Sequence, residues 1–310
     1  MISSFFSKTK PINYAVLLLF LLFFYVLNLF LSDTLTDSNL LLAIVYAAIL
    51  LQVVVVQETV RARKTTNSSS FAMLFFVLLL MAIPKVQFYK DIVFSNLFLM
   101  ISLNRLLALK TLKLVKQKIF DATLWICVAS IFDPWTLLFL AVIFLAVYVY
   151  GTKEYKNWLV PLVGISFFIL LLVTFLLLTK NIDFLQNHYS YNIQAGFYED
   201  FIKNFSIKPF LFIISILAVI LVVFIKQGYQ GVGRIVHLRI LLVYFLVSVL
   251  IFSINNITSS NYMVLAYSFF PAAVFATNFL ETIKRKRLIE LFLVICIVLP
   301  FVLLTMDLVK

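Results

Sequence analysis

The stretch "YAVLLLFLLFFYVLNLFL", residues 14–31, decides the fold class, because its 18 residues carry no charged side chain. A helix needs roughly 20 consecutive apolar residues to cross the hydrocarbon core of a bilayer. The run does not alternate between apolar and polar residues, as a membrane-spanning strand would require. It therefore predicts a transmembrane α-helix.

The rest of the chain has the same character. Its 310 residues are 64% hydrophobic and 12% charged, and the mean hydropathy is +1.11. Soluble domains are about 45–50% apolar and about 25% charged. We therefore expect an all-α polytopic transmembrane helical bundle that forms a single integral membrane domain over 1–310. The apolar runs predict about eleven spans: 12–32, 39–57, 68–84, 91–109, 119–133, 134–150, 158–179, 209–226, 236–254, 261–281 and 288–307.

The placement of the basic residues predicts the orientation of the bundle. Cytoplasmic connections of membrane proteins are enriched in Lys and Arg. With a cytoplasmic N-terminus every inner connection is basic, and an odd number of spans places the C-terminus outside. The inner segments then hold 18 of the 25 basic residues: Lys8, Lys10, Arg61, Arg63, Lys64, Lys110, Lys113, Lys116, Lys118, Lys153, Lys156, Lys226, Arg234, Arg239, Lys284, Arg285, Lys286 and Arg287.

The net charge of +12 has the same explanation. It predicts attraction to the anionic headgroups of the bilayer, and no aromatic and basic surface module indicates nucleic-acid binding. The first apolar run is longer than the roughly 7–15 residues of a signal-peptide core, and no small-x-small cleavage site follows it. We therefore expect the first span to be an uncleaved anchor.

One long polar segment interrupts the spans, "TKNIDFLQNHYSYNIQAGFYEDFIKNFSIKP" at 179–209. The topology places its residues 180–208 outside as a periplasmic loop. Tyr and Phe side chains within it are typical of anchors at the membrane interface. Phe201 and Phe205 lie at helical spacing in "YEDFIKNF", which indicates a short helix on the membrane surface.

The acidic residues are the main candidates for chemistry. Asp133 precedes Pro134, the order typical of a helix N-cap, and Asp91 and Asp37 also stand just ahead of spans, where the helix dipole favours a carboxylate. Asp33 differs, because it follows the first span, where the dipole disfavours a carboxylate. Asp33 is therefore either a solvated loop residue or a residue with a role in function.

Polar residues within the spans are few. Asn28, Gln52 and Asn104 are expected to hydrogen-bond between helices, and Arg105 either extends to the headgroups or binds phosphate. No acid lies at the centre of a span, which disfavours an ion-coupled transporter. No P-loop, GxSxG or HExxH motif is present. His188 has no partner at metal-ligand spacing, so we expect no metal site at this histidine.

Three segments carry a resemblance to known families: "MISSFFSKTKPINYAVLLLFLLFFY" (1–25), "KIFDATLWICVASIFDPWTLLFLAVIFLAVYVY" (118–150) and "NWLVPLVGISFF" (157–168). They resemble an uncharacterised family of polytopic bacterial inner-membrane proteins, which implies a multi-pass protein of that membrane. The layout is also similar to the GT-C glycosyltransferases, which use polyprenyl-phosphate-linked sugars. In that family an acidic residue in the first outer loop acts in catalysis or metal binding, and a tight helical hairpin follows a few spans later. Asp33 and Asp37 match the acidic position, and "ASIFDPWTLLFL" (129–140) matches the hairpin, although the loop 32–38 is shorter than usual.

Three functional hypotheses remain open. In the first, a GT-C-like transferase acts at the outer face, and Asp33 or Asp37 is the general base or holds a divalent cation. Its contacts to the phosphate of a lipid-linked sugar would come from basic side chains of the long outer loop: Lys180, His188, Lys203 and Lys208. In the second, the protein is a non-catalytic scaffold or subunit of a cell-envelope complex, whose 34 Phe residues face lipid and pack helices. The third is a transporter of lipids or small molecules.

Overall fold

The computed structural model describes residues 2–31, 39–67, 69–150, 154–190, 207–227, 232–258 and 262–308. Every regular element in these ranges is a helix, which confirms the predicted all-α class. The helices follow one another in this order, with η for a 3₁₀-helix: α1 (Ile2–Phe6), α2 (Pro11–Leu31), α3 (Asn39–Arg63), α4 (Phe71–Ala82), η1 (Pro84–Phe88), α5 (Lys90–Leu107), η2 (Ala108–Thr111), α6 (Val115–Ala129), η3 (Pro134–Phe139), α7 (Leu140–Val149), α8 (Lys156–Leu178), α9 (Asp183–His188), α11 (Ile207–Gln227), α12 (Val232–Thr258), η4 (Tyr262–Ser268), α13 (Phe269–Thr282) and α14 (Lys286–Leu308).

Each predicted span overlaps a helix or a 3₁₀-helix joined to one. Seven helical segments of the described chain are long and apolar enough to cross a membrane: Pro11–Phe30, Leu40–Arg63, Lys90–Thr111, Lys156–Leu178, Lys208–Lys226, Arg234–Asn256 and Tyr262–Thr282. They indicate a multi-pass membrane protein. The count of eleven crossings and the direction of the chain stay predictions.

Two elements differ from their predicted bounds for identifiable reasons. The second span was predicted to end at residue 57, but α3 continues to Arg63, because the polar residues that follow include good helix formers. The third predicted span, 68–84, corresponds to α4 with only 12 residues. Pro84 follows its last turn and begins η1, and a residue before proline is disfavoured in helical conformation. Gln87 Nε2 then donates to the Leu80 carbonyl at 2.9 Å, which satisfies an acceptor that the helix end leaves free.

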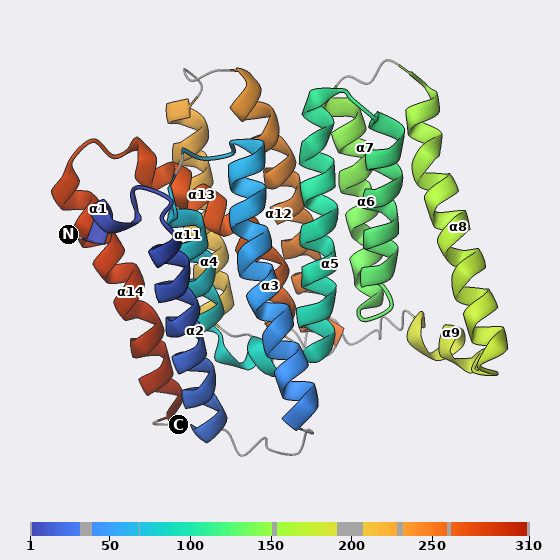
Figure 1. Ribbon diagram of the computed structural model, residues 1–310, viewed down its shortest axis with the longest axis horizontal. Coiled ribbons are helices and arrows are strands. Elements are labelled where there is room, and N and C mark those ends of the chain that lie inside the picture. Colours follow the sequence, from blue (N-terminus) through green and yellow to red (C-terminus); the bar gives the residue numbers. More distant parts are fainter. Residues whose placement is uncertain are drawn as a thin grey trace.

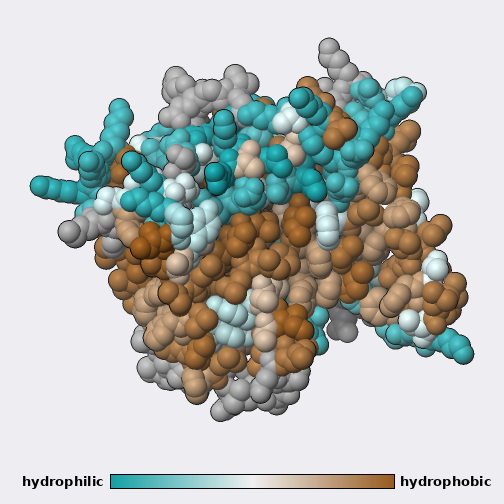
Figure 2. All heavy atoms as spheres, viewed as in Figure 1, coloured by the Kyte–Doolittle hydropathy of each residue, from teal (hydrophilic) through white to brown (hydrophobic). Residues whose placement is uncertain are grey.

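The helices form one bundle in which most helix axes are roughly parallel or antiparallel to one another (Figure 1). In the middle of the bundle, α5 packs on α3 and α6. α13 packs on α4 and α11, and α8 lies at one edge of the bundle against α6 and α7. Figure 2 shows hydrophobic side chains over the middle of one face and hydrophilic side chains across its upper end. We name this upper end, where α3 and α5 end and α6 begins, the basic end. The opposite end holds η1, α9 and the turn between α6 and η3.

Polar residues within the helices form the interhelical hydrogen bonds that the sequence predicted in two of three cases. Gln52 Nε2 on α3 donates to the Val93 carbonyl of α5 at 2.7 Å, and Asn104 Oδ1 accepts from Arg63 Nε at 2.9 Å. The third residue is Asn28, whose Nδ2 has no hydrogen-bond partner within the described ranges.

Candidate functional site

Three polar side chains from distant parts of the chain meet at the end opposite the basic end. Ser95 lies on α5, Asp133 in the turn between α6 and η3, and Tyr267 in η4. The Tyr267 hydroxyl donates to Asp133 Oδ2 at 2.7 Å and lies 2.7 Å from Ser95 Oγ. Ser95 and Tyr267 are fully buried. We call these three residues the Asp133 cluster.

Local sequence explains how Asp133 reaches this position. Its Oδ1 accepts a hydrogen bond from the Trp135 backbone N–H at 3.1 Å, and Pro134 occupies the first turn of η3. This confirms the predicted N-cap, which closes a tight hairpin between α6 and η3. Thr136 Oγ1 donates to the Asp133 carbonyl at 2.7 Å and closes the turn further. One carboxylate oxygen therefore caps a helix, and the other accepts from Tyr267.

Burial in this corner raises the pKa of the Asp133 carboxyl, because a charged group is stabilised less there than in water. The hydrogen bonds from Tyr267 and Trp135 and the charge of His188 lower the pKa, whereas the nearby carboxylate of Asp91 raises it. The net shift of the Asp133 pKa is upward, which means that burial in the cluster disfavours the charged carboxylate more than the hydrogen bonds favour it.

The residues at the end of α9 are fastened to the same hairpin. His188 Nε2 lies 2.9 Å from the Ser130 carbonyl, so this nitrogen carries the hydrogen and donates it. The imidazole stacks on the Phe184 ring, with ring centroids 4.6 Å apart. The Tyr189 hydroxyl lies 3.1 Å from Ser130 Oγ, and burial raises the pKa of this phenol. Two side chains therefore fix the end of α9 on the hairpin.

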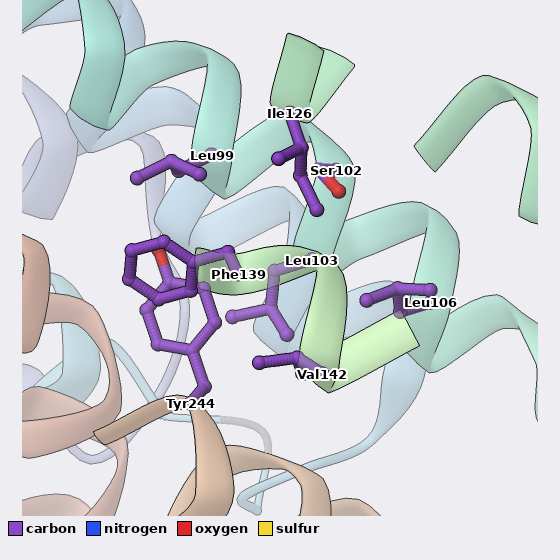
Figure 3. A pocket seen from close by; sticks show the side chains of 8 residues that line it. All are labelled: Leu99, Ser102, Leu103, Leu106, Ile126, Phe139, Val142 and Tyr244. Atoms are coloured by element: carbon purple, nitrogen blue, oxygen red, sulfur yellow. The ribbon is translucent and has the colours of Figure 1, made fainter. Parts of the chain in front are cut away.

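Next to the cluster, the interior between α5, α6, α7 and α12 is filled by packed side chains (Figure 3). Phe139 joins the two regions, since its ring centroid lies 4.5 Å from that of Tyr244 and 6.1 Å from that of Tyr267. The remaining space is too small for a water molecule, and these side chains line it: Leu99, Ser102, Leu103, Leu106, Ile126, Phe139, Val142 and Tyr244. The Tyr244 hydroxyl has no hydrogen-bond partner among the described residues.

The structure brings one predicted site residue to this corner, His188. Lys180 follows α8 with a left-handed φ of 54°, and its exposed side chain makes no hydrogen bond or ion pair to the Asp133 cluster in the described chain. Lys208 is exposed in the first turn of α11. The other three predicted residues lie outside the described residues: Asp33, Asp37 and Lys203. The predicted surface helix at 198–205 lies outside them as well.

Within the described ranges, no group of three or more His, Cys, Asp or Glu side chains is placed so that it could hold a metal ion. The divalent cation of the transferase hypothesis thus stays a prediction tied to Asp33 and Asp37. Sequence reasoning did not find Ser95 and Tyr267, because both lie within apolar runs with no distinguishing spacing. The one available signal was the acid of the hairpin, which we assigned to capping alone.

Comparison with known proteins adds no further constraint. No protein-family model, no curated protein and no solved structure matches the chain. The resemblances to an uncharacterised inner-membrane family and to the GT-C layout are therefore carried by the quoted segments alone.

Proposed function

We propose that the protein is a non-catalytic scaffold of the bacterial inner membrane, a multi-pass subunit that positions other membrane proteins of the cell envelope. The observation that carries this proposal is the packing between α5, α6, α7 and α12, together with the hydrogen bonds that join α3, α5 and α6. Asn96 Nδ2 on α5 donates to Gln52 Oε1 on α3 at 3.0 Å, and Ser102 Oγ donates to the Ala122 carbonyl of α6 at 2.9 Å. Interhelical hydrogen bonds of this kind hold membrane helices in fixed positions.

The Asp133 cluster supports the same function. Both oxygens of its carboxylate already accept hydrogen bonds from groups of the chain itself, and α9 is fastened to the same turn through Ser130. Such an arrangement fixes a hairpin and the start of an outer segment. A rigid outer end of this kind suits a surface on which a partner protein docks.

A transferase at the outer face is the second candidate, and the position of His188 favours it. This side chain of the outer segment lies close enough to Asp133 for a positive charge on its ring to lower the pKa of the carboxyl. In this function Asp33 or Asp37 would act as general base or hold a divalent cation, and the basic side chains would bind a lipid-linked phosphate.

Complementation distinguishes the two functions. A deletion strain would receive the double variant Asp33→Asn and Asp37→Asn, with Asp183→Asn, an exposed acid of α9, as a control for the loss of an acidic side chain elsewhere. A scaffold keeps its function in both strains, because an amide preserves size and removes only the charge. A transferase loses function in the double variant alone. Loss of complementation with normal protein abundance on an immunoblot would overturn the scaffold proposal.

A further inference from the structure

Five basic side chains gather where α3 and α5 end and α6 begins, and we call them the basic cluster: Arg63, Arg105, Lys110, Lys113 and Lys118. Their charges act on one another. Burial lowers the pKa of the Lys118 ammonium, and so do neighbouring positive charges. These charges belong to Arg63, Arg105 and Lys113. Mutual repulsion of this kind requires the charged groups to be close together.

The partners that hold two of these cations in place are neutral. Arg63 Nε donates to Asn104 Oδ1 at 2.9 Å. Lys118 Nζ donates to the Ala108 carbonyl at 2.9 Å and to Thr111 Oγ1 at 2.7 Å. These bonds fix the position of the charges without neutralising them.

Carboxylates compensate the basic cluster only in part. Arg105 Nε lies 3.6 Å from Asp121 Oδ2, and Glu58 acts on Arg63 at longer range. Lys116 is left out of the cluster, because its Nζ contacts Glu154 Oε2 at 3.0 Å. Positive charge therefore exceeds negative charge at this site.

The enrichment of basic residues at one end of the bundle does not by itself explain why Arg63 has no carboxylate in contact with it. Arg234 lies at the same end, and its Nη1 is 3.8 Å from Glu281 Oε2. Its Nη2 also donates to Asn67 Oδ1 at 2.9 Å. A rule that enriches basic residues on one side is satisfied equally by Arg234 and by Arg63. Unlike Arg234, Arg63 forms no ion pair in the part of the chain that the structure describes, and further cations surround it.

The backbone adds positive potential at the same place. Leu112 and Leu114 both have a left-handed φ of 51°, which is unusual for a bulky residue. Leu114 precedes α6 and its side chain provides no cap. The first N–H groups of α6 thus lack a side-chain acceptor, and the positive end of the helix dipole lies beside Lys113.

A buried histidine borders the basic cluster. His237 Nδ1 lies 2.8 Å from the Tyr150 hydroxyl, whereas its Nε2 is buried and has no hydrogen-bond partner among the described residues. Lys110 and Arg63 are its charged neighbours. Buried polar atoms normally have partners, so an unpaired one beside several cations points to a group that the site binds.

We propose that the basic cluster binds a phosphate group. Arg and Lys side chains that are fixed in place are the usual protein partners of phosphate oxygens, and guanidinium binds them in a fixed geometry. The phosphate belongs either to the headgroup of an anionic phospholipid or to a soluble phosphate ion. This site lies at the end opposite the Asp133 cluster and does not depend on the function proposed there.

Calorimetric titration of the purified protein in dodecyl maltoside tests the proposal with three probes. Dioctanoyl-phosphatidylglycerol and inorganic phosphate carry a phosphate with net negative charge, and dioctanoyl-phosphatidylcholine, whose phosphate is balanced by the choline cation, controls for insertion of the acyl chains. We expect saturable binding of the phosphatidylglycerol or of the phosphate, and not of the phosphatidylcholine. Binding of the lipid alone assigns the phosphate to a headgroup, and binding of inorganic phosphate assigns it to a soluble ion.

Variants complete the test. Lys113→Gln with Lys118→Gln should weaken binding by at least about tenfold, because two charge-assisted contacts are lost. The control Lys284→Gln with Lys286→Gln removes the same charge from exposed residues at the same end and should leave the affinity unchanged. Lys113 is exposed, so its single variant keeps the test valid if the double variant fails to fold. Absence of saturable binding by both phosphate probes, or equal weakening in the control, would overturn the proposal.

Discussion

Replacing Tyr267 by Phe should lower the stability of the bundle substantially, because one hydroxyl links two elements to η4. The hydroxyl donates to Asp133 Oδ2 at 2.7 Å and lies 2.7 Å from Ser95 Oγ. A hydrogen bond to a charged group contributes about 1.5–3 kcal/mol and one between neutral groups about 0.5–1.5 kcal/mol. The free energy of unfolding of Tyr267→Phe should therefore fall by about 2–4 kcal/mol.

Tyr244 provides a matched control within the same core. It is as deeply buried as Tyr267 and packs on the same Phe139 ring, but its hydroxyl has no hydrogen-bond partner in the described chain. A buried hydroxyl without a partner is unfavourable. Tyr244→Phe should therefore leave the free energy of unfolding unchanged or raise it by about 1 kcal/mol.

The assay is unfolding by sodium dodecyl sulfate in dodecyl maltoside micelles, followed by tryptophan fluorescence. Asp133→Asn combined with Tyr267→Phe completes a double-mutant cycle and should give a coupling energy of about 1–3 kcal/mol. Equal effects of Tyr267→Phe and Tyr244→Phe, or a coupling energy near zero, would refute the view that the Asp133 cluster holds this end of the bundle.

Three further changes test other contacts with the same assay. Gly164→Ala should cost about 1–3 kcal/mol, since its Cβ would lie 2.9 Å from Thr123 Cγ2, and Thr123→Ala should recover most of the loss; no loss would show that α6 and α8 are loosely packed. Glu281→Gln should cost about 1–2 kcal/mol by leaving Arg234 without its carboxylate, and a double variant with Arg234→Gln should lose less than the sum of the single losses; additive losses would argue against the pair. The raised pKa of Asp133 means that the folded state binds the proton more tightly, so wild type should lose stability relative to Asp133→Asn as pH rises from the ordinary value of 3.8 through the raised pKa; a constant difference would contradict the assigned burial.

Sequence reasoning worked where the cause is local. The run 14–31 predicts α2 because length and apolar side chains suffice to define a membrane helix. The cap at Asp133 was predictable as well, since its acceptor role involves Trp135, two residues ahead. Boundaries were less accurate, as α3 shows, because hydropathy marks the membrane and not the end of a helix.

The Asp133 cluster could not be predicted, because its contacts are distant in sequence. Tyr267 is 134 residues from Asp133, and His188 is 58 residues from Ser130. The basic cluster shows the same limit. Four of its five residues were visible as part of an orientation pattern, but the neutral partner of Arg63 lies 41 residues away, and only the packing of α3 on α5 reveals it.

Cysteine labelling tests most directly the central claim that a membrane-crossing bundle separates a cytoplasmic basic end from an outer end. With Cys127 and Cys296 replaced by Ala, single variants would be made at exposed positions of each end. Lys116→Cys and Lys284→Cys represent the basic end, and Lys85→Cys and Asn187→Cys the opposite end.

An impermeant maleimide applied to intact spheroplasts should label Lys85→Cys and Asn187→Cys. The basic-end variants Lys116→Cys and Lys284→Cys should react only after the membrane is opened by detergent. Labelling of basic-end variants in intact spheroplasts, with protection of opposite-end variants, would contradict the orientation. Equal labelling of all four variants in intact spheroplasts would contradict the membrane-crossing bundle itself.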